Sequence, residues 1–176
     1  MQSHRYSMRL YAAALTLSIL GSPVVIAQEI KRVVDPASTL PFAALVTVPA
    51  GAQLTFVSGT IADVANSDAP KGSAEAYGDT KTQAASILGK IEARLHAEGL
   101  SMSDVVKVNV YLVGDPKLGG KMDFAGLNAA YGQFFGTPSQ PNKAARTTVQ
   151  VAALPLPAAL VEIEVTAARV PAAAKS

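Results

Sequence analysis

The chain has 176 residues, with fifteen Lys and Arg against thirteen Asp and Glu, which gives a formal net charge of +2 at pH 7. This near balance, with lysines scattered along the chain, lacks the basic footprint of a nucleic-acid-binding protein. The sequence contains no cysteine, so disulfide bonds are excluded, and its length suits one domain with its own hydrophobic core.

The first 27 residues have the layout of a secretory signal. Arg5 and Arg9 form a basic leader, an apolar run covers 10–20, and small or aliphatic residues lead up to Ala27, where we expect cleavage. An uncleaved membrane anchor is the alternative, but the apolar run is shorter than the roughly 20 residues that a spanning helix needs. We therefore expect a periplasmic or secreted protein, without a membrane anchor after cleavage. No cysteine follows the apolar run, so a lipoprotein anchor is excluded.

Cleavage would leave a formally neutral chain. The leader holds two of the fifteen basic residues and none of the thirteen acidic ones, so thirteen of each remain. We divide this remainder into an N-terminal segment over 28–39, a folded domain over 40–170 and a tail over 171–176.

The domain is expected to begin with two strands. Residues 42–48 and 53–58 are rich in β-forming residues and flank a Pro-Ala-Gly-Ala stretch at 49–52, which predicts a hairpin. The segment 61–78 has no sustained apolar period and is expected to be a loop. A helix should follow from Thr80, because Thr80 and Gln83 have capping-box spacing, apolar residues recur at helical spacing, and Gly99 supplies a stop.

The second half of the domain continues with a strand over 105–112, where valines and a leucine alternate with polar residues. After a loop over 114–120, an apolar stripe predicts a helix over about 122–135 that stops at Gly136. Two strands, 146–151 and 160–167, end the domain. The order ββαβαββ predicts an α+β sandwich, with one mixed sheet and two helices on one face.

Strand parity places several polar residues together. Arg146, Thr148 and Gln150 share one face of their strand, and Glu162 and Glu164 share one face of theirs. If the two strands pair, all five lie on the face that the helices leave bare. Such a face is most often a solvated surface. The alternative is that another subunit covers it, in which case the arginine would bind a carboxylate and a glutamate would orient or deprotonate water.

Arg146 is the strongest candidate for a functional residue. A guanidinium among β-branched residues is a ready fork for a carboxylate. The rest of the chain has no cysteine, no histidine pair and no phosphate-binding glycine loop, and a metal site is not expected. His96 is expected to be a solvated helix residue, and Tyr131, Phe134 and Phe135 to serve core and subunit packing.

Several motifs resemble the Rid family, the reactive intermediate deaminases, also called the YjgF family. The resemblance runs from about residue 40 to residue 169. The motifs are Ser58-Gly59-Thr60-Ile61, Gly99-Leu100 through Asp104-Val105-Val106-Lys107, Asn128-Ala129-Ala130-Tyr131-Gly132-Gln133-Phe134-Phe135, Ala145 to Val151 with Leu154-Pro155, and Val161-Glu162-Ile163-Glu164. The resemblance implies a chorismate-mutase-like α+β subunit, assembled as a homotrimer with pockets at the subunit clefts.

The resemblance also implies a reaction. Arg146 would clamp the carboxylate of a short-lived 2-imino acid, and water would hydrolyse the imine to a 2-oxo acid and ammonia, without a metal or an organic cofactor. Glu162 would position or activate the water, and Ser58, Asn128 and Thr148 would line the pocket. The alternative is a non-catalytic trimer that binds a small carboxylate metabolite or a protein partner.

Three positions depart from the family pattern. Phe42 stands where many active members have a tyrosine after a proline, Thr148 where some have a cysteine, and Ala145 where a proline often precedes the arginine. These changes bear on substrate preference more than on Arg146 itself.

Overall fold

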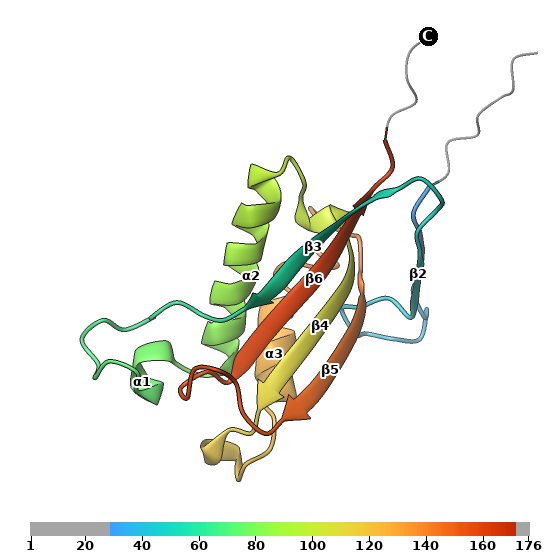
Figure 1. Cartoon of the computed structure of the whole chain (residues 1–176). Coiled ribbons are helices and arrows are strands. Elements are labelled where there is room, and N and C mark those ends of the chain that lie inside the picture. The colour runs from blue at the N-terminus through green and yellow to red at the C-terminus, as the bar shows by residue number, and fades with distance from the viewer. Residues whose placement is uncertain (1–28, 172–176) are drawn as a thin grey trace, which may run out of the picture.

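The computed structural model describes residues 29–171, so the predicted signal and the residues after 171 lie outside the described part. Figure 1 shows an α+β fold in which two helices pack on one side of a twisted sheet. The strands are β1 (Lys31–Val33), β2 (Leu45–Thr47), β3 (Gln53–Thr60), β4 (Val105–Val113), β5 (Ala145–Val151) and β6 (Val161–Arg169). The helices are α1 (Ala74–Tyr77), α2 (Thr80–Ala97) and α3 (Phe124–Tyr131), with short 3-10 turns at Met102–Asp104 and Pro116–Leu118.

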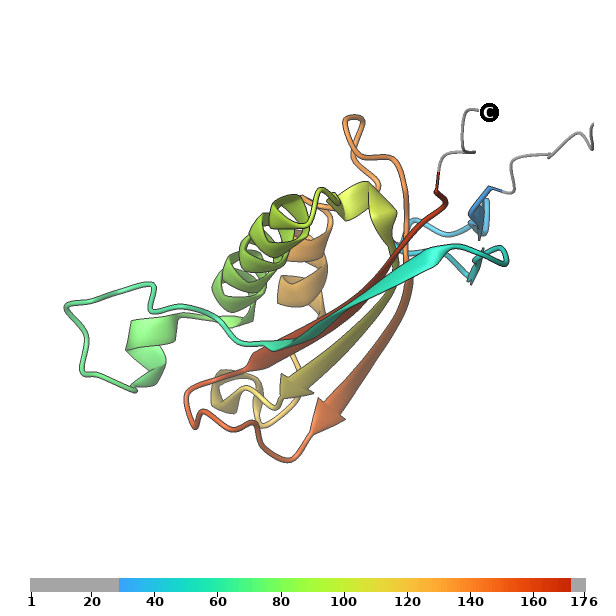
Figure 2. The same cartoon turned by 45° about the horizontal axis from the view of Figure 1, so that its top comes forward.

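The main sheet is mixed and has the strand order β3-β6-β4-β5. β6 runs antiparallel to both β3 and β4, whereas β4 and β5 are parallel. Figure 2, turned from the first view, shows α2 and α3 side by side on one face and the other face bare of helices. This arrangement confirms the predicted fold class. Among the described residues, no helix is both long and apolar enough to cross a membrane.

The core lies between the sheet and the two helices. From β4, Val108, Val110 and Leu112 point into it and are at most 1% exposed. From α2, Ile87, Leu88, Ile91 and Leu95 meet them at helical spacing, all equally buried. The alternation in β4 and the apolar stripe of α2 therefore form the two sides of one packed layer, as the sequence predicts.

The predicted hairpin between 42–48 and 53–58 is wrong. β2 pairs with β1 in a separate two-stranded sheet, while β3 pairs with β6. The physical reason is the position of the chain before β2, where Ala43 bridges to Ala145 at the β5 edge of the main sheet. Since β3 forms the opposite edge, the two segments do not pair along their length.

Three local predictions also need correction. The segment 61–78 is not entirely a loop, because Ser73 caps the short helix α1. The cap of α2 is Asp79, whose carboxylate accepts from the Thr82 N–H, and not the predicted box of Thr80 and Gln83. The helix predicted over 122–135 is α3, which ends at Tyr131 because the next residue, a glycine, is a poor helix former and the chain continues in tighter turns.

The last two strands do not pair, because β4 lies between β5 and β6, so the condition for placing all five polar residues on the bare face is not met. In the parallel register Arg146 is opposite Val108 and Thr148 is opposite Val110, and both valines are core residues. Paired residues of neighbouring strands share a face. Arg146, Thr148 and Gln150 therefore lie on the helix-covered face, whereas Glu162 and Glu164, opposite Tyr111 and Asn109, lie on the bare face as predicted.

Gln83 provides a test of this packing. It is fully buried in α2, donates from Nε2 to the Gly78 and Ala158 carbonyls at 3.1 Å, and accepts from the Leu160 N–H at 2.8 Å. Substitution Gln83→Ala leaves these backbone groups without partners and should lower the free energy of unfolding by about 3 kcal/mol in urea denaturation. The control Gln133→Ala, at an exposed site on the turn after α3, should change it by less than about 0.5 kcal/mol. Equal effects of the two substitutions would contradict the structural role of Gln83.

Candidate functional site

Arg146 extends from β5 toward α3 at the edge of the covered sheet face. Its Nη2 donates to the Oδ1 of Asn128 at 2.7 Å. Its Cζ lies 4.5 Å from the ring centroid of Phe42, 4.5 Å from that of Tyr131 and 5.4 Å from that of Phe124. The guanidinium is thus held by one amide and three aromatic rings, a setting that favours a cation.

Helical spacing explains why α3 supplies most of these groups. Phe124, Asn128 and Tyr131 occupy positions i, i+4 and i+7, which lie along one face of a helix. The helix begins at an Asp123 cap, whose carboxylate accepts from the Gly126 N–H at 2.8 Å. A single stripe of a two-turn helix therefore presents two rings and an amide to Arg146.

Phe42 reaches the same place from the other end of the sequence. Ala43, the next residue, donates its N–H to the Ala144 carbonyl at 2.9 Å, and both alanines are buried. This contact attaches the chain before β2 to the start of β5, next to Arg146. The side chain of Phe42 is half-buried, while that of Phe124 is 37% exposed. These two rings form the accessible rim of the cluster, whereas Tyr131 is fully buried at its base.

The charge of Arg146 is not neutralised within the described chain. Among residues 29–171, no carboxylate lies within ion-pairing distance of its guanidinium, and its Nη1 is buried without a hydrogen-bond partner. Burial lowers the pKa of the guanidinium, an effect that Tyr131 opposes. An arginine nevertheless stays charged at neutral pH. A partly buried cation with a free donor is an electrostatic setting for a carboxylate ligand.

Two hydroxyls close to this arginine also lack partners. The Thr148 Oγ1 and the Tyr131 hydroxyl are both buried and unpaired. Desolvation raises the pKa of Tyr131, an effect that Arg146 and Arg32 oppose, so the phenol is neutral at pH 7. Buried polar groups in proteins are usually satisfied, so three unpartnered polar atoms on β5 and α3 mark this cluster as a candidate binding site.

The structure thus brings together four of the predicted site residues: Arg146, Asn128, Thr148 and Phe42. Asn128 contacts the arginine directly, so its geometry fits a role in positioning the guanidinium. The sequence predicts core and subunit packing for Tyr131 and no functional role for Phe124. The i, i+4, i+7 spacing with Asn128 was the available signal for both.

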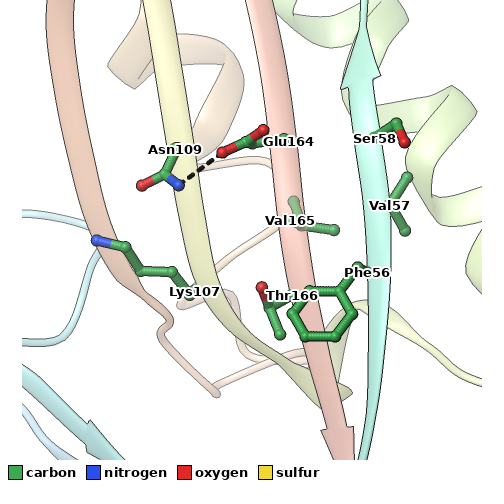
Figure 3. A pocket seen from close by; sticks show the side chains of 8 residues that line it. All are labelled: Phe56, Val57, Ser58, Lys107, Asn109, Glu164, Val165 and Thr166. Carbon is green, nitrogen blue, oxygen red and sulfur yellow. Dashed lines mark hydrogen bonds between the residues drawn. The ribbon is translucent and has the colours of Figure 1, made fainter.

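Ser58 and Glu162 lie elsewhere. Glu162 is half-buried on the bare face of β6 and packs so closely on Gly59 that any Cβ at that position would overlap its carboxylate. Ser58 is exposed on β3 and, as Figure 3 shows, lines a pocket on the same sheet together with Phe56, Lys107, Asn109 and Glu164. Within this pocket Asn109 donates to Glu164 at 2.8 Å. The predicted roles of Ser58 and Glu162 stay predictions.

Comparison with known proteins identifies the family. A model of the family described as Endoribonuclease L-PSP matches residues 33–169. The chain belongs to this family, known as Rid or YjgF. Protein DfrA from Myxococcus xanthus is 38% identical over 121 residues, which are 68% of this chain and 79% of the relative. This Rid chain also resembles TdcF from Escherichia coli, which is named as a reactive intermediate deaminase, with 37% identity over 52% of the chain and 64% of the relative.

Solved Rid structures confirm the fold. The Rid protein YyfB from Yersinia pestis matches with a TM-score of 0.60 and 24% identity, over 80% of this chain and 98% of that one. The structure of Escherichia coli TdcF with bound serine matches with a TM-score of 0.51 and 30% identity, over 79% of this chain and 99% of that one. Each of the two matches covers nearly the whole length of the compared protein and therefore extends over a complete Rid domain.

The Arg146–Asn128 contact predicts an effect of charge on ligand binding. Substitution Asn128→Asp keeps the size and the hydrogen bond but places a carboxylate beside the guanidinium, where it competes with an anionic ligand. We expect the affinity for pyruvate, measured by calorimetry, to fall about tenfold, equivalent to about 1.4 kcal/mol. Asn142→Asp, which adds the same charge at an exposed site, is the matched control. Unchanged affinity in Asn128→Asp would show that Arg146 does not receive the carboxylate.

Proposed function

We propose that this Rid protein hydrolyses reactive 2-imino acids to 2-oxo acids and ammonia. The observation that carries the proposal is the Arg146 guanidinium, partly buried, bonded on one nitrogen to Asn128 and without a partner on the other. TdcF, a relative named as a reactive intermediate deaminase, has been crystallised with serine, a compound that carries a carboxylate. An arginine fork that fixes the carboxylate of a 2-imino acid would orient the adjacent imine carbon for attack.

Carboxylate binding requires a small opening of the site. Nη1 has almost no exposed surface, and the Phe42 ring lies over the guanidinium. Phe42 belongs to a half-exposed segment outside the main sheet, whereas Tyr131 is locked in the core by stacking on Phe135 at 4.4 Å. A shift of the half-buried Phe42 ring is therefore the movement that we propose gives a carboxylate access to Nη1.

Hydrolysis of an imine requires few catalytic groups from the protein. Water adds through its oxygen to the imine carbon, the nitrogen takes up protons, and the carbon–nitrogen bond of the tetrahedral intermediate breaks. The hydroxyl proton is then lost, which leaves the 2-oxo acid and ammonia. A carboxylate near the imine carbon serves as the base that orients the water, and Glu162 is the proposed group. An imine is already electrophilic, so orientation and one base suffice.

Arg146 and Glu162 cannot share a site within one chain, because they lie on opposite faces of the sheet. We propose a homotrimer in which the arginine of one subunit meets the glutamate of the next. The bare face supports this assembly, since Phe56 on it is 73% exposed and Leu54 and Val149 are 46% and 42% exposed. The predicted export of the protein, to the periplasm or the medium, remains part of this proposal.

We do not extend the ribonuclease activity in the family description to this chain. Several of its cations are engaged internally: Arg32 donates to the Ser103, Val105 and Lys143 carbonyls, and Arg94 donates to Thr60. The charge of the chain after the predicted cleavage is balanced. Neither feature suits a surface that binds a polyanion.

A binding protein without catalysis is the second candidate. It is favoured by Phe42, which contributes no hydroxyl to the arginine site, and by the distance of Glu162 from Arg146 in the single chain. Such a protein would hold a small carboxylate metabolite at Arg146 or would engage a protein partner through the bare face. It would bind 2-oxo acids without accelerating imine hydrolysis.

Semicarbazide trapping tests the deaminase proposal. An amino-acid oxidase generates 2-imino acids, which semicarbazide captures unless the purified protein hydrolyses them first. The wild type should divert imine from the trap, and Arg146→Ala should lower kcat/KM about a hundredfold, equivalent to about 2.7 kcal/mol in the barrier. Binding of 2-oxo acids by a wild-type protein that leaves trapping unchanged for every amino acid would favour the binding protein.

Mixed trimers test the shared site. Arg146→Ala and Glu162→Gln should each be nearly inactive alone. Co-expressed in equal amounts, they form random trimers in which about one quarter of the interfaces pair an intact arginine with an intact glutamate, so about one quarter of wild-type activity should return. If both residues acted from the same chain, no subunit of the mixture would hold a complete pair, and activity would stay at the level of the single variants.

A further inference from the structure

Arg32 of β1 joins the points at which β4 and β5 begin. Its Nη1 donates to the carbonyl of Val105 at 2.9 Å and to that of Lys143 at 3.1 Å, and its Nη2 donates to the Ser103 carbonyl at 2.9 Å. Val105 and Lys143 each lie two residues before the first pair of the parallel β4–β5 ladder. One guanidinium nitrogen therefore bridges the two strands just where their pairing starts.

The stretch that leads into β5 receives further contacts from the chain before β2. The Ala43 N–H donates to the Ala144 carbonyl at 2.9 Å, and the Nζ of Lys143 donates to the Leu40 carbonyl at 3.0 Å. β1, which contains Arg32, is itself paired with β2. The beginning of β5 is thus held both by the side chain of Arg32 and by the backbone that follows β1.

The chemistry of these contacts explains why an arginine stands at this position. Carbonyl oxygens only accept hydrogen bonds, so Ser103, Val105 and Lys143 cannot bond to one another and need a shared donor. A guanidinium offers several N–H groups in a fixed planar fork, and bonds from a charged donor are stronger than those from a neutral one. Loss of Arg32 would remove the bonds that join the starts of β4 and β5.

We propose that Arg32 is a positioning residue for Arg146. The register between β4 and β5 decides which face of the sheet carries Arg146, because a shift of one residue turns each side chain to the opposite face. Arg32 ties both strands at the start of this register, at Lys143, three residues before Arg146. It therefore acts through β5 and not by contact with a ligand. The inference rests on the proposed function only where a bound carboxylate is the readout.

A spectroscopic test reports on Arg146 without any ligand. In the ¹⁵N-labelled protein from expression of the full chain, the Nε–Hε signal of Arg146 is identified by its loss in Arg146→Lys. Arg32→Met should move this signal and accelerate hydrogen exchange of the 145–147 amides at least about tenfold. The matched control Arg94→Met removes an arginine that donates to Thr60 at 2.6 Å, and it should do neither. An unmoved Arg146 signal in the folded Arg32→Met protein would overturn the inference.

A conservative variant separates positioning from folding. Arg32→Lys keeps the charge but not the planar fork, and it takes the place of Arg32→Met in both tests if the methionine variant does not fold. Calorimetry with pyruvate should rank the affinities as wild type, Arg32→Lys and Arg32→Met. We expect at least about a fivefold loss in Arg32→Met, because a less fixed Arg146 must be ordered on binding. Arg94→Met should stay within about twofold of the wild type.

The two readouts distinguish this inference from the proposed function. A wild-type protein that binds no carboxylate and hydrolyses no imine would contradict the proposed function, and the Arg146 signal would still decide the role of Arg32. Wild-type pyruvate affinity in the folded Arg32 variants would leave the proposed function standing and overturn the inference.

Discussion

The parallel register between β4 and β5 is the constraint on which the candidate site depends. Across the covered face, Val57 of β3, Val165 of β6, Val108 of β4 and Arg146 of β5 form one row. The arginine thus takes the place of a fourth valine where the row reaches the sheet edge. A slip of one residue in β5 would turn Arg146 to the bare face and Thr147 into the core layer. The site therefore exists because the side chain of Arg146 points to the same face of the sheet as the core valines of the neighbouring strands.

The packing around Arg146 makes this position tolerable for a cation. The aliphatic stem continues the apolar layer, and the guanidinium finds the faces of Phe42 and Tyr131 and the amide of Asn128 at its end. These contacts fix the orientation of the fork, but they do not neutralise its charge. The stripe of α3 accordingly has two roles, because Tyr131 completes the core by stacking on Phe135 and also supports the arginine.

Local sequence patterns predict much of the fold. The alternation of β4 and the helical period of α2 are strong signals, and both elements appear nearly within their predicted bounds. Strand order is different, because it depends on contacts between distant segments that alternation does not encode. Parity correctly placed Arg146, Thr148 and Gln150 on one face of β5 and Glu162 and Glu164 on one face of β6. It could not show that β4 separates these strands, which removes the condition for placing the arginine on the bare face.

The candidate site shows the same division between local and long-range information. Arg146 could be selected from the sequence because a cation in a β-rich segment is conspicuous and because the surrounding motifs resemble the Rid family. The contact of Phe42 with Arg146 depends on a bridge between Ala43 and Ala145, and no local sequence pattern predicts that bridge. The stripe of Phe124 and Tyr131 has the spacing of any core-facing helix, so only its position beside β5 distinguishes it from ordinary packing.

Arg146 and Glu162 lie on opposite faces of the sheet, so the proposed trimer is needed to bring the two residues into one site. Arg146 lies on the face that the helices cover, in β5, which is an edge strand of the sheet. The glutamate lies on the other face, packed against Gly59, so the sheet itself separates its carboxylate from the Arg146 of the same chain. We propose that a second copy of the chain covers the bare face, brings its β5 edge toward this glutamate and removes water from the exposed apolar residues of that face. In the proposed trimer, burial of the exposed apolar residues and completion of the site are therefore consequences of the same contact, so a weakened interface should reduce stability and activity together.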